Sequence, residues 1–239
     1  MAAAFNEVGF NCIDVHMTDL ISARHTLAEF EGLVACGGFS YGDVLGAGGG
    51  WANSILFNKD LRTQFGDFFH NENVFSLGVC NGCQTLSLLK SLIPGATNWP
   101  DFKRNKSEKF EARLVQVSVK ESSSIFFKDM RDSIITVPVA HGEGRVDASV
   151  SDISELNNNH YTTITYSDDK GSFTEDYPAN PNGSLNGIAG VTNISGTVTI
   201  MMPHPERAFL KDQYSWSPDE WTHYSPWIKF FNNAREFIG

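Results

Sequence analysis

The residues best suited to chemistry lie in the run Leu77-Gly-Val-Cys-Asn-Gly-Cys-Gln84, at the predicted junction of a strand and a helix. Cys80 has a glycine two positions to either side, Gly78 and Gly82. A sharp strand-to-helix turn strains the residue at its tip and excludes bulky neighbours, so this spacing is typical of a nucleophile on such a turn. The helix N-terminus would favour thiolate at Cys80, which is the attacking form. It would also place the backbone amide of Asn81 where an oxyanion develops.

A cysteine nucleophile needs a general base within hydrogen-bond reach, and the base needs an orienting group. The segment Pro203-His-Pro-Glu-Arg207 offers both, directly after a predicted strand. Residues i and i+2 of an extended segment project to the same side, and Pro205 favours extended geometry at His204. The spacing therefore predicts that His204 and Glu206 point the same way, so that the carboxylate can fix the tautomer of the imidazole.

Other interpretations of the cysteine motif stay open at this point. Cys80 is alternatively a buried cysteine beside a tight glycine turn. Cys80 and Cys83 also form a C-x-x-C pair, which thioredoxin-like thiol-disulfide oxidoreductases place after a strand and at a helix start. A structural zinc site has less support, because no second C-x-x-C or histidine pair has ligand spacing. The histidine and glutamate around Pro205 favour the nucleophile.

A glycine-rich segment, Cys36-Gly-Gly-Phe-Ser-Tyr-Gly-Asp43, leaves the carboxyl end of a predicted strand. Ligands bind at that edge of open α/β sheets, and glycines let backbone N–H groups approach a substrate. Gly38 is therefore the second predicted oxyanion donor, although the segment is alternatively a simple turn. It matches neither a Walker motif nor G-x-G-x-x-G, so no site for ATP or a dinucleotide is evident.

One more segment, Val139-Ala-His-Gly-Glu-Gly-Arg145, has a histidine and a carboxylate two residues apart. His141 and Glu143 could form a rival base pair. We prefer to interpret the segment as a glycine-rich turn that lines the pocket.

A sheet must bring these segments to one edge. The first half of the chain alternates β-rich runs at 12–17, 33–36 and 74–79 with helical patterns at 51–58, 60–70 and 81–92. This alternation predicts an α/β fold with an open, doubly wound, mostly parallel sheet. Strands at 112–120, 134–139 and 161–166, and a hairpin of 187–192 with 197–201, predict an antiparallel flank. An amphipathic helix is predicted at 227–237.

Composition excludes several classes of protein. The net charge of −10 gives no electrostatic footprint for nucleic acid, and no apolar run approaches the roughly 20 residues of a membrane span. Four cysteines in 239 residues are too few for a disulfide scaffold, and the N-terminus does not resemble a secretory signal. We therefore predict a cytoplasmic protein. The glycosylation sequons that begin at Asn105, Asn182 and Asn193 are then interpreted as accidental.

Taken together and in this order, the motifs Gly-Gly-Phe-Ser-Tyr-Gly-Asp, Gly-Val-Cys-Asn-Gly-Cys-Gln, Ala-His-Gly-Glu-Gly-Arg and Pro-His-Pro-Glu-Arg resemble the class I (triad-type) glutamine amidotransferases. The resemblance is closest to the glutaminase domain at the C-terminus of the large phosphoribosylformylglycinamidine synthases, and it implies a flavodoxin-like fold. It covers essentially the whole chain. It implies that Cys80 is the nucleophile, that His204 is the base and then the acid, and that Glu206 orients His204.

The resemblance also implies ligands and partners. Gln84 and the backbone near Gly142 and Glu143 would hold L-glutamine, whose ammonia passes to a synthase domain of the same or a companion chain. ATP and magnesium are expected only in that synthase portion, and no cofactor or metal is expected in this chain. We expect residues 1–239 to be one glutaminase domain and a fragment of a longer protein, because the chain opens inside the first helix of the family and lacks the first strand. A module that binds a partner without turnover is a further alternative.

Overall fold

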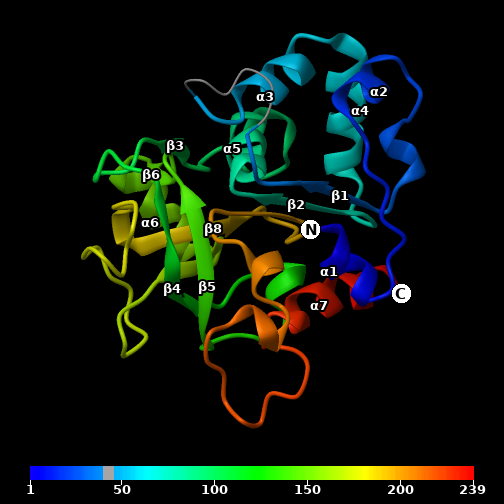
Figure 1. The fold of residues 1–239 in the computed structure, drawn as a ribbon. Coiled ribbons are helices and arrows are strands. Elements are labelled where there is room, and N and C mark those ends of the chain that lie inside the picture. The colour runs from blue at the N-terminus through cyan, green and yellow to red at the C-terminus, as the bar shows by residue number, and fades with distance from the viewer. Residues whose placement is uncertain (40–45) are drawn as a thin grey trace.

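The computed structural model describes residues 1–39 and 46–239 (Figure 1). Seven of the described strands form one sheet in the order β1-β2-β9-β8-β7-β4-β5, and β3 and β6 form a small second sheet. The strands are β1 (Gly32–Ala35), β2 (Phe75–Val79), β3 (Asp101–Lys103), β4 (Glu111–Val119), β5 (Ile134–His141), β6 (Arg145–Asp147), β7 (Thr162–Tyr166), β8 (Ile188–Thr192) and β9 (Val198–Met201).

Among the strands that the structure describes, parallel pairing is confined to β1, β2 and β9, which lie side by side. The pairs β8–β9, β7–β8, β4–β7 and β4–β5 are antiparallel. The predicted α/β class with an antiparallel flank, including the hairpin of β8 and β9, is therefore confirmed. The expectation of a mostly parallel sheet needs a correction, because the antiparallel strands continue the same sheet and make it mixed.

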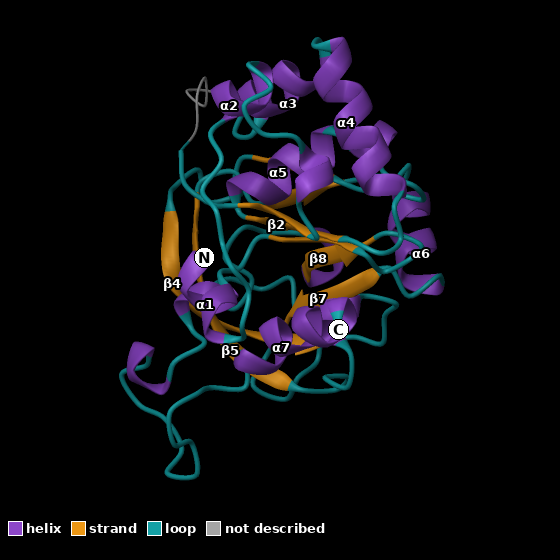
Figure 2. Cartoon of the chain, turned by 90° about the vertical axis from the view of Figure 1, so that its right-hand side faces the viewer, coloured by secondary structure: helices purple, strands orange, loops and turns teal. Residues whose placement is uncertain are grey.

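Helices cover both faces of this sheet. Figure 2 shows α3, α4 and α5 on one side and α1 and α7 on the other. The helices are α1 (Ala2–Glu7), α2 (Met17–Ile21), α3 (Gly49–Leu56), α4 (Lys59–His70), α5 (Asn81–Leu88), α6 (Val150–Asn158) and α7 (Ile228–Ile238). Short 3₁₀ turns are η1 (Leu27–Glu29), η2 (Lys90–Leu92), η3 (Ile125–Phe127), η4 (Leu185–Gly187), η5 (Pro205–Arg207) and η6 (Lys211–Gln213).

The predicted strand at 12–17 is wrong. Residues 12–16 have no strand assignment, and helix α2 begins at Met17 with His16 as its N-cap. The Nδ1 of His16 accepts from the Thr18 N–H at 3.2 Å, and the Asp19 carboxylate accepts from the His16 N–H at 3.2 Å. This capping box starts the helix at the last residue of the run predicted to be a strand. The β-rich residues form a strand only where a neighbouring strand accepts their hydrogen bonds, and β1 pairs with β2 instead.

A cluster of aromatic rings holds the central strands from the side of α1 and α7. Neighbouring rings have centroids 4.8 to 5.9 Å apart and come from Phe5, Phe75, Phe126, Phe230 and Phe231. All residues of β2 and β9 are buried, as expected for strands with both faces covered. The ends of these two strands are therefore fixed in position, and the predicted site residues follow directly after them.

Candidate active site

Cys80 stands on a strained turn between β2 and α5. Its φ of +56° and ψ of −109° are unusual for a residue that carries a side chain. The Cys80 N–H donates to the Met201 carbonyl at 2.9 Å, and the Cys80 carbonyl accepts from the Gln84 N–H at 3.1 Å. These bonds attach the turn to β9 on one side and to α5 on the other. The thiol lies at the mouth of α5, with Sγ 3.6 Å from the Ala140 carbonyl oxygen.

The two glycines that flank the turn are required by close backbone contacts. A Cβ on Gly82 would lie 1.8 Å from the Ala35 carbonyl oxygen, and one on Gly78 would lie 2.7 Å from the Gly82 carbonyl oxygen. Neither position has room for a side chain, because backbone atoms cannot move aside as a flexible side chain can. The prediction that this turn needs small residues on both sides of Cys80 is confirmed.

His204 and Glu206 form a buried pair just after β9. The His204 Nδ1 donates to Glu206 Oε1 at 2.7 Å, and the His204 side chain is fully buried. The prediction that the two side chains point the same way is confirmed. The backbone reason differs in part, because Pro205–Arg207 forms the 3₁₀ turn η5 and only His204 itself is near extended geometry. The carboxylate fixes the ring in the tautomer that presents Nε2 to the rest of the site.

Cys80 and His204 meet at Gly37, on the loop after β1. A Cβ on Gly37 would lie 2.8 Å from His204 Cε1 and 3.1 Å from Cys80 Cβ. The side chains of His204 and Cys80 therefore both lie next to Gly37. Within the described part of the chain, His204 Nε2 has no hydrogen-bond partner of standard geometry. Since Nδ1 is held by Glu206, Nε2 is the nitrogen available to the thiol.

The environment of His204 favours the imidazolium. Burial by itself would lower the pKa of His204, but the neighbouring Cys80 and the Glu206 carboxylate outweigh burial and raise the pKa to about 9. His204 is therefore protonated at neutral pH. A protonated ring beside the thiol can stabilise an anionic sulfur and can later donate a proton to a leaving group.

The predicted glutamine-binding residues also come together. The Gln84 side chain, on α5, donates to the Glu143 carbonyl oxygen at 2.5 Å, and Glu143 Oε2 accepts from the Ala47 N–H at 3.0 Å. The preceding carbonyl, of Gly142, accepts from the Asn105 N–H at 2.9 Å. The turn after β5 thus joins α5 to the loop before α3.

The two predicted oxyanion donors lie at the start of α5 and on the loop after β1. Asn81 is the first residue of α5, and Gly38 follows Gly37 with a φ of +105°. The rest of the predicted glycine-rich segment, 40–43, lies outside the described residues. Asn81 thus follows Cys80 directly in the chain and Gly38 follows the Gly37 position that contacts Cys80, and the role of both as donors stays a prediction.

The family model of the CobB/CobQ-like glutamine amidotransferase domain matches residues 1–238. The chain belongs to this family. The fold of this amidotransferase is similar to a chain of the structure of PurLQS from Thermotoga maritima, with a TM-score of 0.72, 24% identity, and coverage of 100% of this chain and 91% of that chain. It is also similar to a putative GMP synthase subunit from Thermoplasma acidophilum, with a TM-score of 0.54, 16% identity, and coverage of 99% of this chain and 85% of that chain.

The rival pair of His141 and Glu143 does not form in the amidotransferase. The Glu143 carboxylate binds Ala47, whereas His141 Nε2 lies 3.1 Å from the side-chain nitrogen of Asn182. Burial, and next the nearby His204, lower the pKa of His141 to about 3, so the ring is neutral. The preferred interpretation of this segment, a glycine-rich turn beside the site, agrees with these contacts.

The thiol-disulfide alternative has no support in the structure. Cys83 lies in α5 and is fully buried, and burial, followed by the proximity of Cys80, raises its pKa well above the usual value. Thiol exchange needs an accessible thiolate, which Cys83 does not offer. Both cysteines are free thiols.

Three residues of the amidotransferase site were not predicted from the sequence. Gly37 lay inside the noted glycine-rich segment, but only the fold shows that it touches both Cys80 and His204. Asn105 and Asn182 were noted only as the first residues of accidental sequons. Both are buried with their amides engaged in hydrogen bonds, which leaves no room for a glycan. The only sequence signal for Asn105 and Asn182 was that asparagine is common in turns.

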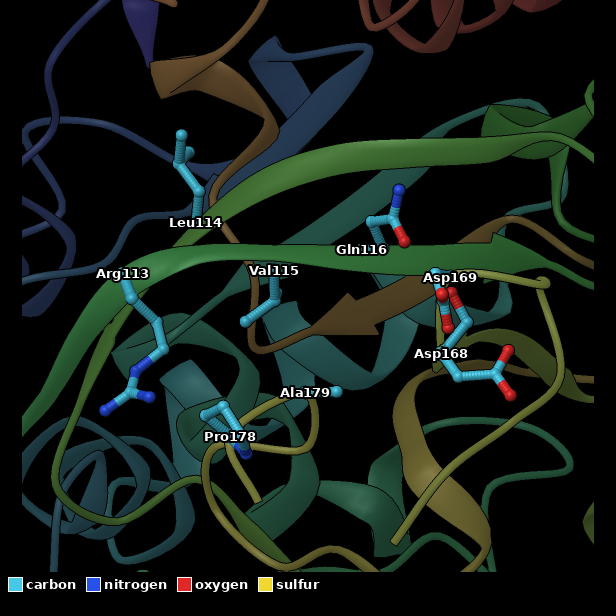
Figure 3. A pocket seen from close by; sticks show the side chains of 9 residues that line it. Arg113, Leu114, Val115, Gln116, Asp168, Asp169, Pro178 and Ala179 are labelled. Atoms are coloured by element: carbon cyan, nitrogen blue, oxygen red, sulfur yellow. The ribbon is translucent and has the colours of Figure 1, made fainter. Parts of the chain in front are cut away.

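A surface groove of about 410 Å³ lies apart from these residues (Figure 3). It is lined by Arg113–Gln116 of β4, by 167–169 and by Pro178 and Ala179. None of the predicted site residues lines it. Arg113 at its rim stacks over the Tyr177 ring at 4.8 Å, a contact that attaches the loop after β7 to β4.

Within residues 1–39 and 46–239, no group of three or more His, Cys, Asp or Glu side chains is arranged to hold a metal ion. No helix in the same ranges is both long and apolar enough to cross a bilayer.

Replacing Glu206 by glutamine is expected to lower the pKa of His204, because the ring loses a charged acceptor. The folded-state pKa of about 9 lies above the ordinary 6.5, so protonation stabilises the fold. That stabilisation is complete below about pH 6.5 and is lost as the pH rises through about 9. The melting temperature should therefore fall across this window in the wild type and fall less in Glu206→Gln.

NMR titration of the His204 ring and melting curves from pH 6 to 10 measure the two effects. Glu155→Gln, on the exposed side of α6, is the control and should behave like the wild type. A wild-type His204 that titrates near 6.5 would contradict the assigned environment.

Proposed function

We propose that this glutamine amidotransferase domain hydrolyses L-glutamine through Cys80, His204 and Glu206. The observation that carries the proposal is the convergence of three loops: the Gly37 position touches both Cys80 and His204, and Glu206 holds the opposite nitrogen of the His204 ring. This is the arrangement that a cysteine nucleophile with an oriented base requires.

In the proposed reaction, the Cys80 thiolate attacks the side-chain amide carbon of glutamine. The N–H groups of Gly38 and Asn81 stabilise the resulting oxyanion. Protonated His204 donates its Nε2 proton to the amide nitrogen, the C–N bond breaks, and ammonia leaves a glutamyl thioester on Cys80.

The second half of the reaction regenerates the site. Neutral His204 Nε2 takes a proton from water, and the hydroxide attacks the thioester carbon. The C–S bond breaks, glutamate is released, and Cys80 returns as thiolate beside the imidazolium. Gln84 and the turn at Gly142 and Glu143 hold the substrate in this scheme.

We further propose that the domain is the glutaminase part of a phosphoribosylformylglycinamidine synthase. Its ammonia would pass to a synthase portion that converts formylglycinamide ribonucleotide to the amidine with ATP and magnesium, and this chain itself would use no cofactor. The four motifs support this assignment, and the similarity in fold to a chain of PurLQS agrees with it. Four free cysteines fit a cytoplasmic enzyme.

A glutamine analogue that alkylates the nucleophile, 6-diazo-5-oxo-norleucine, tests the chemistry. Peptide mass spectrometry should find the adduct on Cys80, with glutamate release lost in parallel. An adduct on Cys83, or none at all, would contradict the proposed nucleophile.

Glutamate release, with and without the synthase portion, tests the partner. Formylglycinamide ribonucleotide and ATP should increase glutamine hydrolysis only when the synthase portion is present. If the intact complex never hydrolyses glutamine, the domain is a binding module without turnover.

A further inference from the structure

A buried turn at residues 180–184 lies directly behind the turn that carries Glu143. Asn180, Asn182 and Ser184 in it are all at most 1% exposed. The Asn180 Oδ1 accepts from the Gly183 and Ser184 N–H groups at 2.9 and 3.2 Å, which closes the turn locally. The Asn182 Nδ2 points out of this turn, toward His141 at the end of β5 and Gly144 just after it.

The orientation of the Asn182 amide is set by its neighbours. Its Oδ1 accepts from the Ser184 backbone N–H at 3.0 Å, and its Nδ2 donates to the Gly144 carbonyl at 2.8 Å. A backbone N–H can only donate and a carbonyl can only accept, so the amide cannot be flipped. The nitrogen side of Asn182 therefore faces His141 Nε2 at 3.1 Å and also the Tyr166 hydroxyl at 3.1 Å.

This orientation determines the tautomer of His141. Asn182 Nδ2 can only donate, so His141 Nε2 pairs with it as an acceptor, and a neutral ring in this pair carries its proton on Nδ1. That Nδ1 is buried and has no hydrogen-bond partner among the described residues, so donor-donor repulsion at Nε2 is what selects this tautomer. The lowered pKa of His141 agrees with a ring that does not take a second proton. The ring also packs on Gly144, where a Cβ would lie 2.2 Å from His141 Cδ2.

The turn between His141 and Gly144 is thus held on two sides. Asn182 holds the ring of His141 and the carbonyl of Gly144. Asn105 donates to the His141 carbonyl at 2.8 Å and accepts from the Gly144 N–H at 3.0 Å. Glu143 stands between these fixed ends, and it contacts both Gln84 and Ala47.

We propose that Asn182 is a positioning residue for glutamine binding: by keeping His141 in the Nδ1–H tautomer against Gly144, it fixes the turn that presents Glu143 to Gln84. Asn182 is not placed in contact with the reacting atoms. The inference rests on the proposed role of Gln84 and Glu143 as part of the glutamine pocket.

The substitution Asn182→Asp keeps the shape and the acceptor to Ser184 but removes both N–H donors. A carboxylate facing Nε2 should draw the His141 proton from Nδ1 to Nε2, and the Gly144 carbonyl loses its donor. We expect the KM for glutamine to rise about tenfold while kcat changes by no more than about threefold.

Asn180→Asp is the matched control. It lies in the same buried turn, keeps its acceptor to Ser184, and loses donors to the Thr174 and Ser184 carbonyls at 3.0 and 2.9 Å. It does not contact His141 or Gly144. We expect a similar loss of melting temperature, with the KM and the His141 tautomer of the wild type.

NMR of protein with ¹⁵N-labelled histidine reads the tautomer directly, with the His141 signals assigned by their loss in His141→Gln. A wild-type ring protonated on Nε2 overturns the proposal, and this measurement needs no variant of Asn182 to fold. Three results with the variants would also overturn the proposal. The KM for glutamine could be unchanged in Asn182→Asp, or it could rise without a change in the His141 tautomer. The KM could also rise equally in Asn180→Asp. Failure of the wild type to hydrolyse glutamine would refute the proposed function and leave the tautomer result standing.

Discussion

Cys80→Ala is expected to reduce glutamine hydrolysis by at least about 10³-fold, because it removes the nucleophile of the proposed reaction. The fold should survive, since the Cys80 backbone keeps its bonds to Met201 and Gln84 and only the sulfur is lost. Glutamate release under saturating glutamine measures the loss, and circular dichroism checks the fold. Ammonia-dependent synthase activity in the reconstituted complex should be retained.

Cys83→Ala is the matched control for this prediction. It removes a sulfur three residues away on the same helix, at a cost of about 1 kcal/mol of stability for a small buried group. Glutaminase activity should stay within about threefold of the wild type, since Cys83 does not take part in the proposed acyl transfer. Equal loss in the two variants would favour a dithiol mechanism over the nucleophile.

Gly82→Ala is expected to destabilise the fold and to lower the rate of glutamine hydrolysis. The new methyl group would lie 1.8 Å from the Ala35 carbonyl oxygen and 2.4 Å from the Ala35 carbonyl carbon, so α5 must move away from β1. Overpacking of this kind costs about 3 kcal/mol or more, and a shift of Cys80 by about 1 Å can cost about 10²-fold in rate. Urea denaturation and glutamate release measure the two effects.

Gly66→Ala serves as the comparison, because Gly66 lies inside α4 and a Cβ there has no heavy atom within 4 Å. Alanine is the better helix former, so this variant should gain about 0.5 to 1 kcal/mol of stability and keep full activity. If Gly82→Ala were as stable as Gly66→Ala, the close packing of α5 on β1 would be refuted.

The parts of the site that could be predicted from the sequence are local ones. Gly78, Cys80 and Gly82 lie within one turn, and His204 and Glu206 are two residues apart, so short-range geometry suffices. The contact of Asn182 with His141 joins residues 41 positions apart, and no local pattern specifies it. The meeting of Gly37 with Cys80 and His204 likewise depends on the neighbouring order of β1, β2 and β9.

The fold was predictable to a similar degree. Long runs such as β4 and the pattern of α4 show their period clearly, whereas β3 and β6 are three residues long and have no detectable alternation. Helix α6 was missed because only Ile153 and Leu156 mark its buried face, although Ser149 caps it. The expectation that the first strand of the family is absent from this chain stays a prediction.

The place of β9 in the sheet has a consequence for the newly made chain. β9 enters between β2 and β8, and its pairing of Val198 with Ser76 joins segments far apart in sequence. Contacts of such long range form late in folding. A ribosome-bound chain that has already built the Cys80 turn therefore carries a thiol without its imidazole, and glutamine hydrolysis cannot begin before His204 has been synthesised and β9 has entered the sheet.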